Sequence, residues 1–208
     1  MRKYSDYDED IKKEIHERYK LIAGIDEVGR GPLAGPVVSC AVVMKSDSHI
    51  EGITDSKKLT RKKMLDLKVK IENEALAIAY GYANSKLIDK INIRQATLKS
   101  MEDALNSLKI KPEIVLIDAE RINTDIKQLN IVKGDLKEYT ISAASILAKV
   151  RRDDIMIKFS KIYPGYSFET NFGYGTKVHY EALEKLGETP IHRQSFLKKF
   201  HERQLSFI

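Results

Sequence analysis

The segment that most constrains this chain of 208 residues reads Ile-Ala-Gly-Ile-Asp-Glu-Val-Gly-Arg-Gly-Pro-Leu-Ala-Gly-Pro, at residues 22–36. It begins as an apolar strand, carries the adjacent acids Asp26 and Glu27, and then breaks into a glycine-rich turn around Arg30. Carboxylates at the end of a buried strand are costly unless they pair with a cation or bind one. The segment therefore predicts a site for a hard metal ion, with a solvated acidic turn as the simpler alternative.

Two further features indicate a polyanionic partner. Gly29, Gly31 and Gly35 lack Cβ atoms, so another backbone, such as a nucleic-acid strand, could approach the turn closely. Residues 56–70 hold seven Lys or Arg side chains against Asp66 alone, and the resulting charge of +6 equals the formal net charge of the whole chain. A charge focused in this way predicts binding to nucleic acid, with a solvated helix face as the alternative.

The sequence carries no sign of export or membrane insertion. The first ten residues contain no apolar signal region, and the longest apolar run, at residues 37–44, is far shorter than the ~20 residues that span a bilayer. The single cysteine, Cys40, excludes an internal disulfide and fits a buried strand position. We therefore expect a cytoplasmic protein that binds no membrane.

The patterns along the chain predict an α/β fold with a mixed five-stranded sheet flanked by helices. Strands are expected at residues 21–28, 37–44, 76–83, 113–117 and 128–132. Helices are expected at residues 5–19, 61–74, 92–108, 140–159 and, as the last, 177–186, with Thr60 and Thr176 as caps. We expect a single domain over residues 1–208, in which residues 1–19 form a lead-in helix and residues from about 160 to 208 form a C-terminal helical part.

Segment 22–36 resembles the first signature of the type 2 ribonuclease H family, also called ribonuclease HII. Six further motifs resemble that family in the expected order, at residues 55–60, 88–97, 117–118, 142–153, 173–176 and 192–196. Together the motifs span about residues 20–200, which is nearly the whole chain. The resemblance implies a ribonuclease H-like fold with a C-terminal helical extension.

The resemblance also implies four catalytic, metal-binding acids: Asp26, Glu27, Asp118 and Asp153. They would hold Mg²⁺ or Mn²⁺, with two ions acting together during hydrolysis. Successive strand residues point to opposite faces, so Asp26 and Glu27 share a site only if the strand ends or bulges there. Asp154 is a second candidate for the fourth acid, but the family spacing selects Asp153.

Substrate contacts are implied for several other side chains. The turn formed by Gly29, Arg30 and Gly31 matches the family segment that reads the ribose 2′-OH at an RNA–DNA junction. Tyr174 resembles the tyrosine that packs on the following deoxyribose, with an ordinary half-buried loop tyrosine as the alternative. Candidate phosphate contacts are Ser56, Lys57 and Lys58, together with Arg193, which could instead stabilise the C-terminal helices.

The resemblance implies an endonuclease that cuts the RNA strand of RNA–DNA hybrids. It also implies cleavage on the 5′ side of single ribonucleotides in duplex DNA, leaving 3′-OH and 5′-phosphate ends, by a monomeric enzyme. Three alternatives remain open: a catalytically silent hybrid-binding protein, a type 3 ribonuclease H-like specificity, and a DNA-cutting member of the same superfamily.

The C-terminus, residues 204–208, reads Gln-Leu-Ser-Phe-Ile. It resembles the short peptides with which bacterial proteins bind the replication sliding clamp, although Phe207 and Ile208 stand in a different order. A polar anchor followed by apolar side chains suits a hydrophobic groove. The alternative is a frayed terminus, or one that packs back on the domain.

Overall fold

The computed structural model describes residues 7–45, 48–53, 56 and 59–205. Their strands form one mixed five-stranded sheet in the order β3-β2-β1-β4-β5. Antiparallel pairing joins β3 to β2 and β2 to β1, whereas β1, β4 and β5 run parallel. The predicted fold class is therefore confirmed. The strands are β1 (Ile22–Val28), β2 (Val37–Met44), β3 (Ala75–Ala83), β4 (Ile114–Asp118) and β5 (Lys127–Ile131).

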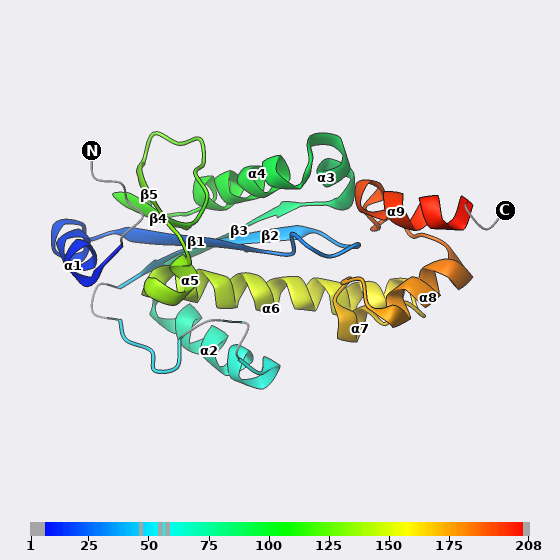
Figure 1. The fold of residues 1–208 in the computed structure, drawn as a ribbon. Helices are drawn as coiled ribbons and strands as arrows, with labels where there is room; N and C mark the ends of the chain where they lie inside the picture. The colour runs from blue at the N-terminus through cyan, green and yellow to red at the C-terminus, as the bar shows by residue number, and fades with distance from the viewer. Residues whose placement is uncertain (1–6, 46–47, 54–55, 57–58, 206–208) are drawn as a thin grey trace.

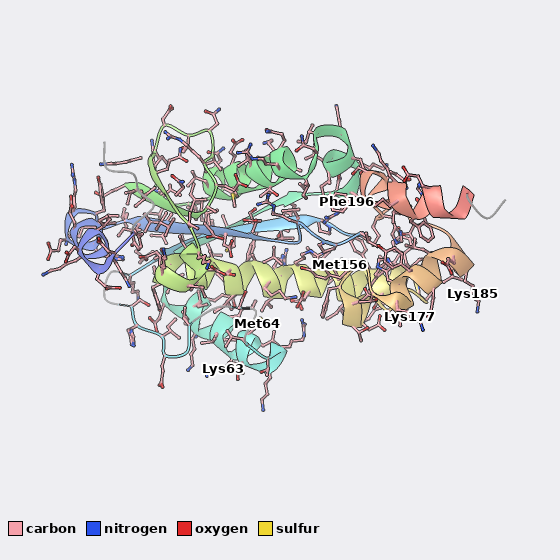
Figure 2. The ribbon with its side chains drawn as sticks, viewed as in Figure 1. Lys63, Met64, Met156, Lys177, Lys185 and Phe196 are labelled. Carbon is pink, nitrogen blue, oxygen red and sulfur yellow. The ribbon has the colours of Figure 1, made fainter. Side chains whose placement is uncertain are left out.

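Helices cover both faces of the sheet (Figure 1). Helix α4 (Ile93–Asn106) packs on β2 and β3, and the long helix α6 (Tyr139–Ile162) packs on β1 and β2 from the other side. Helix α2 (Arg61–Glu74) lies outside α6, with Met64 turned inward and Lys63 turned to solvent (Figure 2).

Two glycines allow these helices to lie close to the sheet. A Cβ atom on Gly24 of β1 would stand 2.2 Å from the backbone carbon of Thr140 in α6. A Cβ atom on Gly81 of β3 would stand 1.8 Å from the carbonyl oxygen of Ser100 in α4. Both distances are far inside van der Waals contact, so only glycine fits at these two positions.

The N-terminal helix α1 (Glu9–Arg18) is anchored to the start of α6 through Glu138. The Tyr7 hydroxyl donates to the fully buried Glu138 carboxylate at 2.5 Å, and His16 Nε2 lies 3.4 Å from the same carboxylate. Burial alone would raise the pKa of Glu138, but the hydrogen bonds from His16 and Tyr7 outweigh it and lower that pKa. The lead-in segment is thus held by a buried, charged hydrogen-bond network.

The C-terminal helices gather at one end of α6 (Figure 1). Helices α7 (Phe168–Asn171) and α8 (Lys177–Leu186) join α9 (Gln194–Leu205), so the prediction that the last helix is the one through Leu186 was wrong. Helix α9 begins where Asp89 of α3 (Ser85–Ile91) accepts hydrogen bonds from the amides of Gln194 and Ser195, both at 2.9 Å. A tertiary contact supplies this cap, which the local sequence does not reveal.

Most other expected elements are present with ends shifted by a few residues. Thr60 caps α2 through the amide of Lys63, and Thr176 caps α8 through the amide of His179, both at 3.3 Å. The short helices α3, α5 (Gly134–Lys137) and α7 were not expected. They contain only four to seven residues, too few for a hydrophobic period to be recognised.

Candidate active site

The parallel pairing of β1 with β4 brings three of the predicted acids together. The register places Ile25 opposite Ile117, so Asp26 and Asp118 follow at neighbouring strand positions. Glu27 is next in β1, and its amide donates to Asp26 Oδ1 at 2.8 Å. The carboxyl ends of parallel strands open on the crevice where α/β proteins place ligands, so this edge is the candidate site.

Asp26 and Glu27 leave the strand on opposite faces. The pairing of β1 with β2 runs without a shift from Ala23 to Val28, so no bulge redirects either side chain. Asp26 shares the face of Gly24 and accepts a hydrogen bond from Ser145 of α6, whereas Glu27 is turned toward Arg30. The two carboxylates therefore lie on opposite faces near the end of β1, and each is close enough to Asp118 for that charge to raise its pKa.

The electrostatics of the three acids fit a cation. Burial, followed by the charges of Glu27 and Asp118, raises the pKa of Asp26 well above its ordinary value. Burial also raises the pKa of Glu27 to about 7, with Asp118 adding to the rise and Arg30 opposing it. Buried like charges of this kind are stabilised by a bound divalent cation, and carboxylate oxygens are the ligands that Mg²⁺ and Mn²⁺ prefer.

The site is not a preformed metal cage. Within the part of the chain that the structure describes, no three His, Cys, Asp or Glu side chains stand together in a geometry that would hold a metal ion. The three acids consequently fit a divalent ion by their charge, their oxygen ligands and their shared position, and their side chains would have to rotate to close on it.

A further acid that the sequence analysis did not single out lies beside Asp118. The amide of Gly134, at the start of α5, donates to Asp118 Oδ1 at 2.7 Å, and the next residue is the buried Asp135. Helix α5 follows β5, the parallel neighbour of β4, so Asp135 also belongs to the carboxyl edge of the sheet. Asp135 lies four residues beyond the end of β5, whereas Asp26 lies within β1, so the pattern of an acid at the end of a strand did not single it out.

Asp153 has a different environment. Its side chain is only 2% exposed, and it accepts from Lys149 Nζ at 2.7 Å and lies 3.7 Å from Arg61 Nη1. Burial raises its pKa, while the charges of Lys149, Arg152 and Arg61 oppose the rise. It lies eight residues beyond Ser145 in α6, which corresponds to ~12 Å along the helix axis.

Arg61 also binds Asp154, through Nη2 and Oδ1 at 2.7 Å. Asp154 therefore shares its cation with Asp153, because a single guanidinium touches both carboxylates. This pair of contacts fastens α2 to α6.

The glycine-rich turn is packed against the protein itself at two of its three glycines. Gly29 has a φ of +103°, and a Cβ atom there would stand 2.2 Å from Arg152 Nε. Gly35 has a φ of +86°, and its Cβ would stand 2.3 Å from the sulfur of Met156, a residue of α6 (Figure 2). The expectation that all three glycines admit another backbone was thus wrong for Gly29 and Gly35. Only Gly31 is open, since the nearest atom to its Cβ position is Tyr174 Cε1 at 3.6 Å.

Two arginines, both fully buried, hold the carbonyl groups of this turn. Arg193 donates to the carbonyl oxygens of Gly29 at 2.6 Å, Arg30 at 2.9 Å and Gly35 at 2.8 Å. Burial lowers the pKa of Arg193 to about 9 and that of Arg152 to about 10. Arg193 is therefore a buried support of the turn, a role that differs from the phosphate contact and from the stabilisation of the C-terminal helices predicted for it. Arg152 donates to the carbonyl oxygens of Pro36, Ala34 and Phe172.

Arg30 stands at the open side of the turn and bridges two acids. Its Nη1 lies 3.4 Å from Glu27 Oε1 and 3.1 Å from Glu120 Oε1. The other oxygen of Glu120 lies 3.6 Å from Arg94 Nε. Glu120 belongs to none of the sequence motifs, and only the loop after β4 brings it to this position.

The remaining predicted substrate residues are placed as follows. Tyr174 is 43% exposed beside Gly31, with the Arg152 guanidinium 5.9 Å from its ring centre. Ser56 is buried, and its hydroxyl lies 3.0 Å from that of Ser145. Lys57, Lys58 and residues 206–208 of the C-terminal peptide lie outside the described residues.

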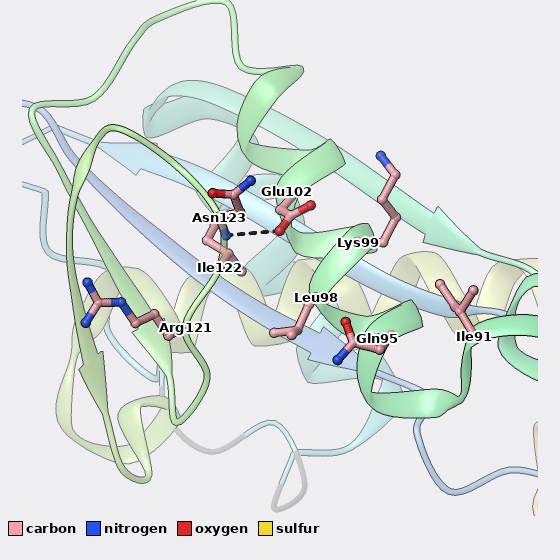
Figure 3. A pocket seen from close by; sticks show the side chains of 8 residues that line it. All are labelled: Ile91, Gln95, Leu98, Lys99, Glu102, Arg121, Ile122 and Asn123. Atoms are coloured by element: carbon pink, nitrogen blue, oxygen red, sulfur yellow. Dashed lines mark hydrogen bonds between the residues drawn. The ribbon is translucent and has the colours of Figure 1, made fainter.

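The loop that carries Glu120 borders a groove of about 680 Å³ between α4 and the segment after β4 (Figure 3). Glu102 of α4 accepts a hydrogen bond from the amide of Asn123 at 3.0 Å across this groove. The side chain of Gln128 binds the backbone of Ile122 twice. Its Oε1 accepts from the Ile122 amide at 3.0 Å, and its Nε2 donates to the Ile122 carbonyl oxygen at 2.8 Å. These bonds fix the path of the loop.

Comparisons with known proteins agree with this architecture. The model of the family described as Ribonuclease HII matches residues 23–199. A Ribonuclease HII of Clostridioides difficile (strain 630) is 55% identical over 181 residues, which cover 86% of this chain and 71% of that protein. The crystal structure of ribonuclease H2 from Pyrococcus horikoshii OT3 superposes with a TM-score of 0.74 at 29% identity, over 88% of this chain and 98% of that one.

The fold is also shared with the RNase HII of the PCNA:RNase HII complex from Archaeoglobus fulgidus. The TM-score is 0.71 at 23% identity, over 84% of this chain and 94% of that chain. Of the helices formed by the described residues, none has the length and apolar character needed to cross a membrane.

Proposed function

The chain belongs to the ribonuclease HII family, and we propose from this premise how its acids and its glycine-rich turn act on nucleic acid. Members of the family are metal-dependent ribonuclease H hydrolases that cut the RNA strand of RNA–DNA hybrids. For this chain we propose, beyond that activity, two-metal catalysis and cleavage on the 5′ side of single ribonucleotides in duplex DNA, with 3′-OH and 5′-phosphate products.

The observation that carries the proposal is the meeting of Asp26, Glu27 and Asp118 at the carboxyl ends of β1 and β4. Bound there, Mg²⁺ or Mn²⁺ would activate a water molecule and stabilise the leaving 3′ oxygen. The three carboxylates hold and orient the ions. Their burial strengthens that attraction because water screens it less.

We propose Asp135 as a fourth acid of this site and assign Asp153 a secondary role. Asp135 follows the residue whose amide binds Asp118, whereas Asp153 is neutralised by Lys149 and Arg61 farther along α6. In this arrangement the pairing of Asp153 with Arg61 orients α2 on α6.

Reading of the ribose is proposed for the open part of the turn. Gly31 leaves room for a sugar edge, Tyr174 offers an exposed ring beside it, and Arg30 offers a guanidinium to a phosphate. A 2′-OH is the group that distinguishes RNA from DNA at a single position. Rigid support of the turn by Arg152 and Arg193 would keep the 2′-OH contact within hydrogen-bond distance.

Several partners remain proposals for this chain. The metal is Mg²⁺ or Mn²⁺, the enzyme is a cytoplasmic monomer, and the substrates are RNA–DNA hybrids and ribonucleotide-containing duplex DNA. Binding of a sliding clamp through residues 204–208 is supported by the Archaeoglobus complex, whose RNase HII has the same fold. In this chain Gln204 and Leu205 continue α9.

The test is cleavage of a duplex that contains one ribonucleotide, compared with a long hybrid and an all-DNA duplex, with and without Mg²⁺. Asp118→Asn keeps the shape of the side chain but removes a charged ligand, so the rate should fall by roughly 10³-fold or more with the fold intact. Asp135→Asn should cause a loss of the same order, and Asp153→Asn a smaller one. If Asp153→Asn instead caused the larger loss and Asp135→Asn the smaller one, the fourth acid of the site would be Asp153. Cleavage of the all-DNA duplex, or hybrid binding without cleavage, would contradict the proposed activity.

A further inference from the structure

Glu120 holds Arg30 at the edge of the site. A single nitrogen of Arg30 lies between two carboxylates, 3.1 Å from Glu120 and 3.4 Å from Glu27. The Glu120 side chain is 14% exposed, whereas that of Arg30 is 42% exposed. The better-buried Glu120 is thus the nearer anchor of the more exposed arginine.

The backbone fixes the position of Glu120. Ala119 adopts a φ of +51°, its amide donates to the carbonyl of Ile131 at 3.0 Å, and the Glu120 amide lies 2.6 Å from the carbonyl oxygen of Asp118. On the far side, Arg94 Nε lies 3.6 Å from the second carboxylate oxygen. A tight turn directly after a proposed metal ligand therefore aims this carboxylate at Arg30.

The charges explain why such an anchor is needed. With no cation at the site, Arg30 is attracted by both Glu27 and Glu120. A divalent ion on Glu27 would repel the guanidinium, and in the reverse sense a guanidinium that sat fully on Glu27 would compete with the ion.

We propose that Glu120 is a positioning residue that competes with Glu27 for Arg30, so that Arg30 can give up its 3.4 Å contact with Glu27 when a divalent cation binds there and still stay at the turn for a substrate phosphate. The inference rests on the proposed metal role of Glu27. It concerns a side chain that touches neither the ion nor the substrate in this arrangement.

The experiment is a calorimetric titration of the purified full-length protein with Mn²⁺, without nucleic acid. Glu120→Gln should weaken binding by roughly three- to fivefold, the value of one partly exposed ion pair, because the released Arg30 would move onto Glu27. The same substitution in an Arg30→Gln background should change the affinity by less than about 1.5-fold. In Glu120→Gln the Mg²⁺ concentration for half-maximal cleavage should rise by a similar factor, with the rate at saturating Mg²⁺ largely retained.

Two further variants serve as controls. Glu102→Gln removes a nearby carboxylate that binds the Asn123 amide, so its Mn²⁺ affinity should match that of the original protein. Glu120→Asp keeps the charge but withdraws it by one methylene, so it should also weaken binding. If Glu120→Gln shows an altered circular dichroism spectrum, the Mn²⁺ affinity of Glu120→Asp tests the inference in its place.

Three results would overturn the inference. They are an unchanged affinity in Glu120→Gln, an equal loss in the presence and absence of Arg30, and an Asp variant that binds like the original protein. Either of the last two results would mean that Glu120 acts only through the overall negative charge around the site. Failure of the underlying function looks different, because Glu27→Gln would then leave Mn²⁺ binding intact.

Discussion

At the scale of single residues, the burial of two arginines distinguishes this site most clearly. Arg152 and Arg193 are buried without exposure, and the hydrogen bonds described above bind each of them to three backbone carbonyl groups. Taking a guanidinium out of water is costly, and five fixed N–H donors that match fixed acceptors offset that cost. The gain is a turn whose carbonyls cannot move independently of α6 and α9.

Gly24 and Gly31 give a prediction for single residues, because the first is packed against a helix backbone and the second has free space at its Cβ position. Gly24→Ala would place a Cβ atom 2.2 Å from the α6 backbone, which must then move, so the free energy of unfolding should fall by about 2–3 kcal/mol. Gly31→Ala meets its first neighbour at 3.6 Å and should change that free energy by less than about 0.5 kcal/mol. Urea denaturation of both variants checks this, and similar losses at the two positions would contradict the packing of α6 on β1.

At the scale of elements, α2 combines an apolar face with a basic face. Met64, Leu67 and Ile71 are buried against the core, while Lys62, Lys63 and Lys70 point to solvent. Arg61 fastens the start of the helix to α6 through Asp153 and Asp154. The basic face is therefore held rigidly beside the proposed site.

This arrangement predicts a strong dependence of substrate affinity on salt. Each phosphate contact contributes about −0.9 to the slope of log K against log salt concentration for duplex DNA. Replacing Lys57 and Lys58 together by Gln should therefore make the slope less negative by about one to two.

Fluorescence anisotropy with a labelled hybrid in Ca²⁺ measures the slope. Lys185→Gln on α8 is the control, because this side chain lies among the C-terminal helices and belongs to none of the proposed substrate contacts (Figure 2). Equal slopes in the original protein and in the Lys57/Lys58 variant would mean that the basic residues at 56–70 form a solvated face that does not bind nucleic acid.

At the scale of the whole molecule, a buried histidine pair joins α8 to the segment before α9, and His192 forms a bridge with Ala34 in the turn between β1 and β2. His179 Nε2 lies 3.0 Å from His192 Nε2 inside a cluster that includes Tyr166 and Phe168. Burial, followed by the charge of His179, lowers the pKa of His192 to about 4. His192 also precedes Arg193, so the pair and the support of the turn lie on the same segment.

The pKa of His192 makes stability depend on pH in a defined direction. In the unfolded chain the imidazole titrates near 6.5, so below that pH the unfolded state binds a proton that the folded state does not. The free energy of unfolding should therefore decrease as the pH falls from about 6.5 to 4, by as much as about 3 kcal/mol from this residue. In His192→Gln the decrease should be smaller, whereas His49→Gln, an exposed position, should behave like the original protein. Denaturant unfolding at a series of pH values measures the effect, and parallel curves for all three proteins would refute it.

The sequence by itself determined the sheet and its edge. Apolar alternation located the five strands, including β2 to the residue, and the caps Thr60 and Thr176 are local hydrogen bonds between neighbours in the chain. Asp26 and Glu27 were noticeable from the apolar run that carries them, whereas the resemblance to the family singled out Asp118, and the metal role of all three stays a prediction.

Only the tertiary structure decided which distant groups meet. The positions of Asp135 and Glu120 depend on parallel strand pairing and on a turn at Ala119, and the start of α9 depends on Asp89 in another helix. Arg193 and Gly29 are 164 residues apart, yet one binds the other's carbonyl. Such contacts follow from packing, in which each group is satisfied by partners remote in sequence, so no local pattern of hydrophobicity or charge could reveal them.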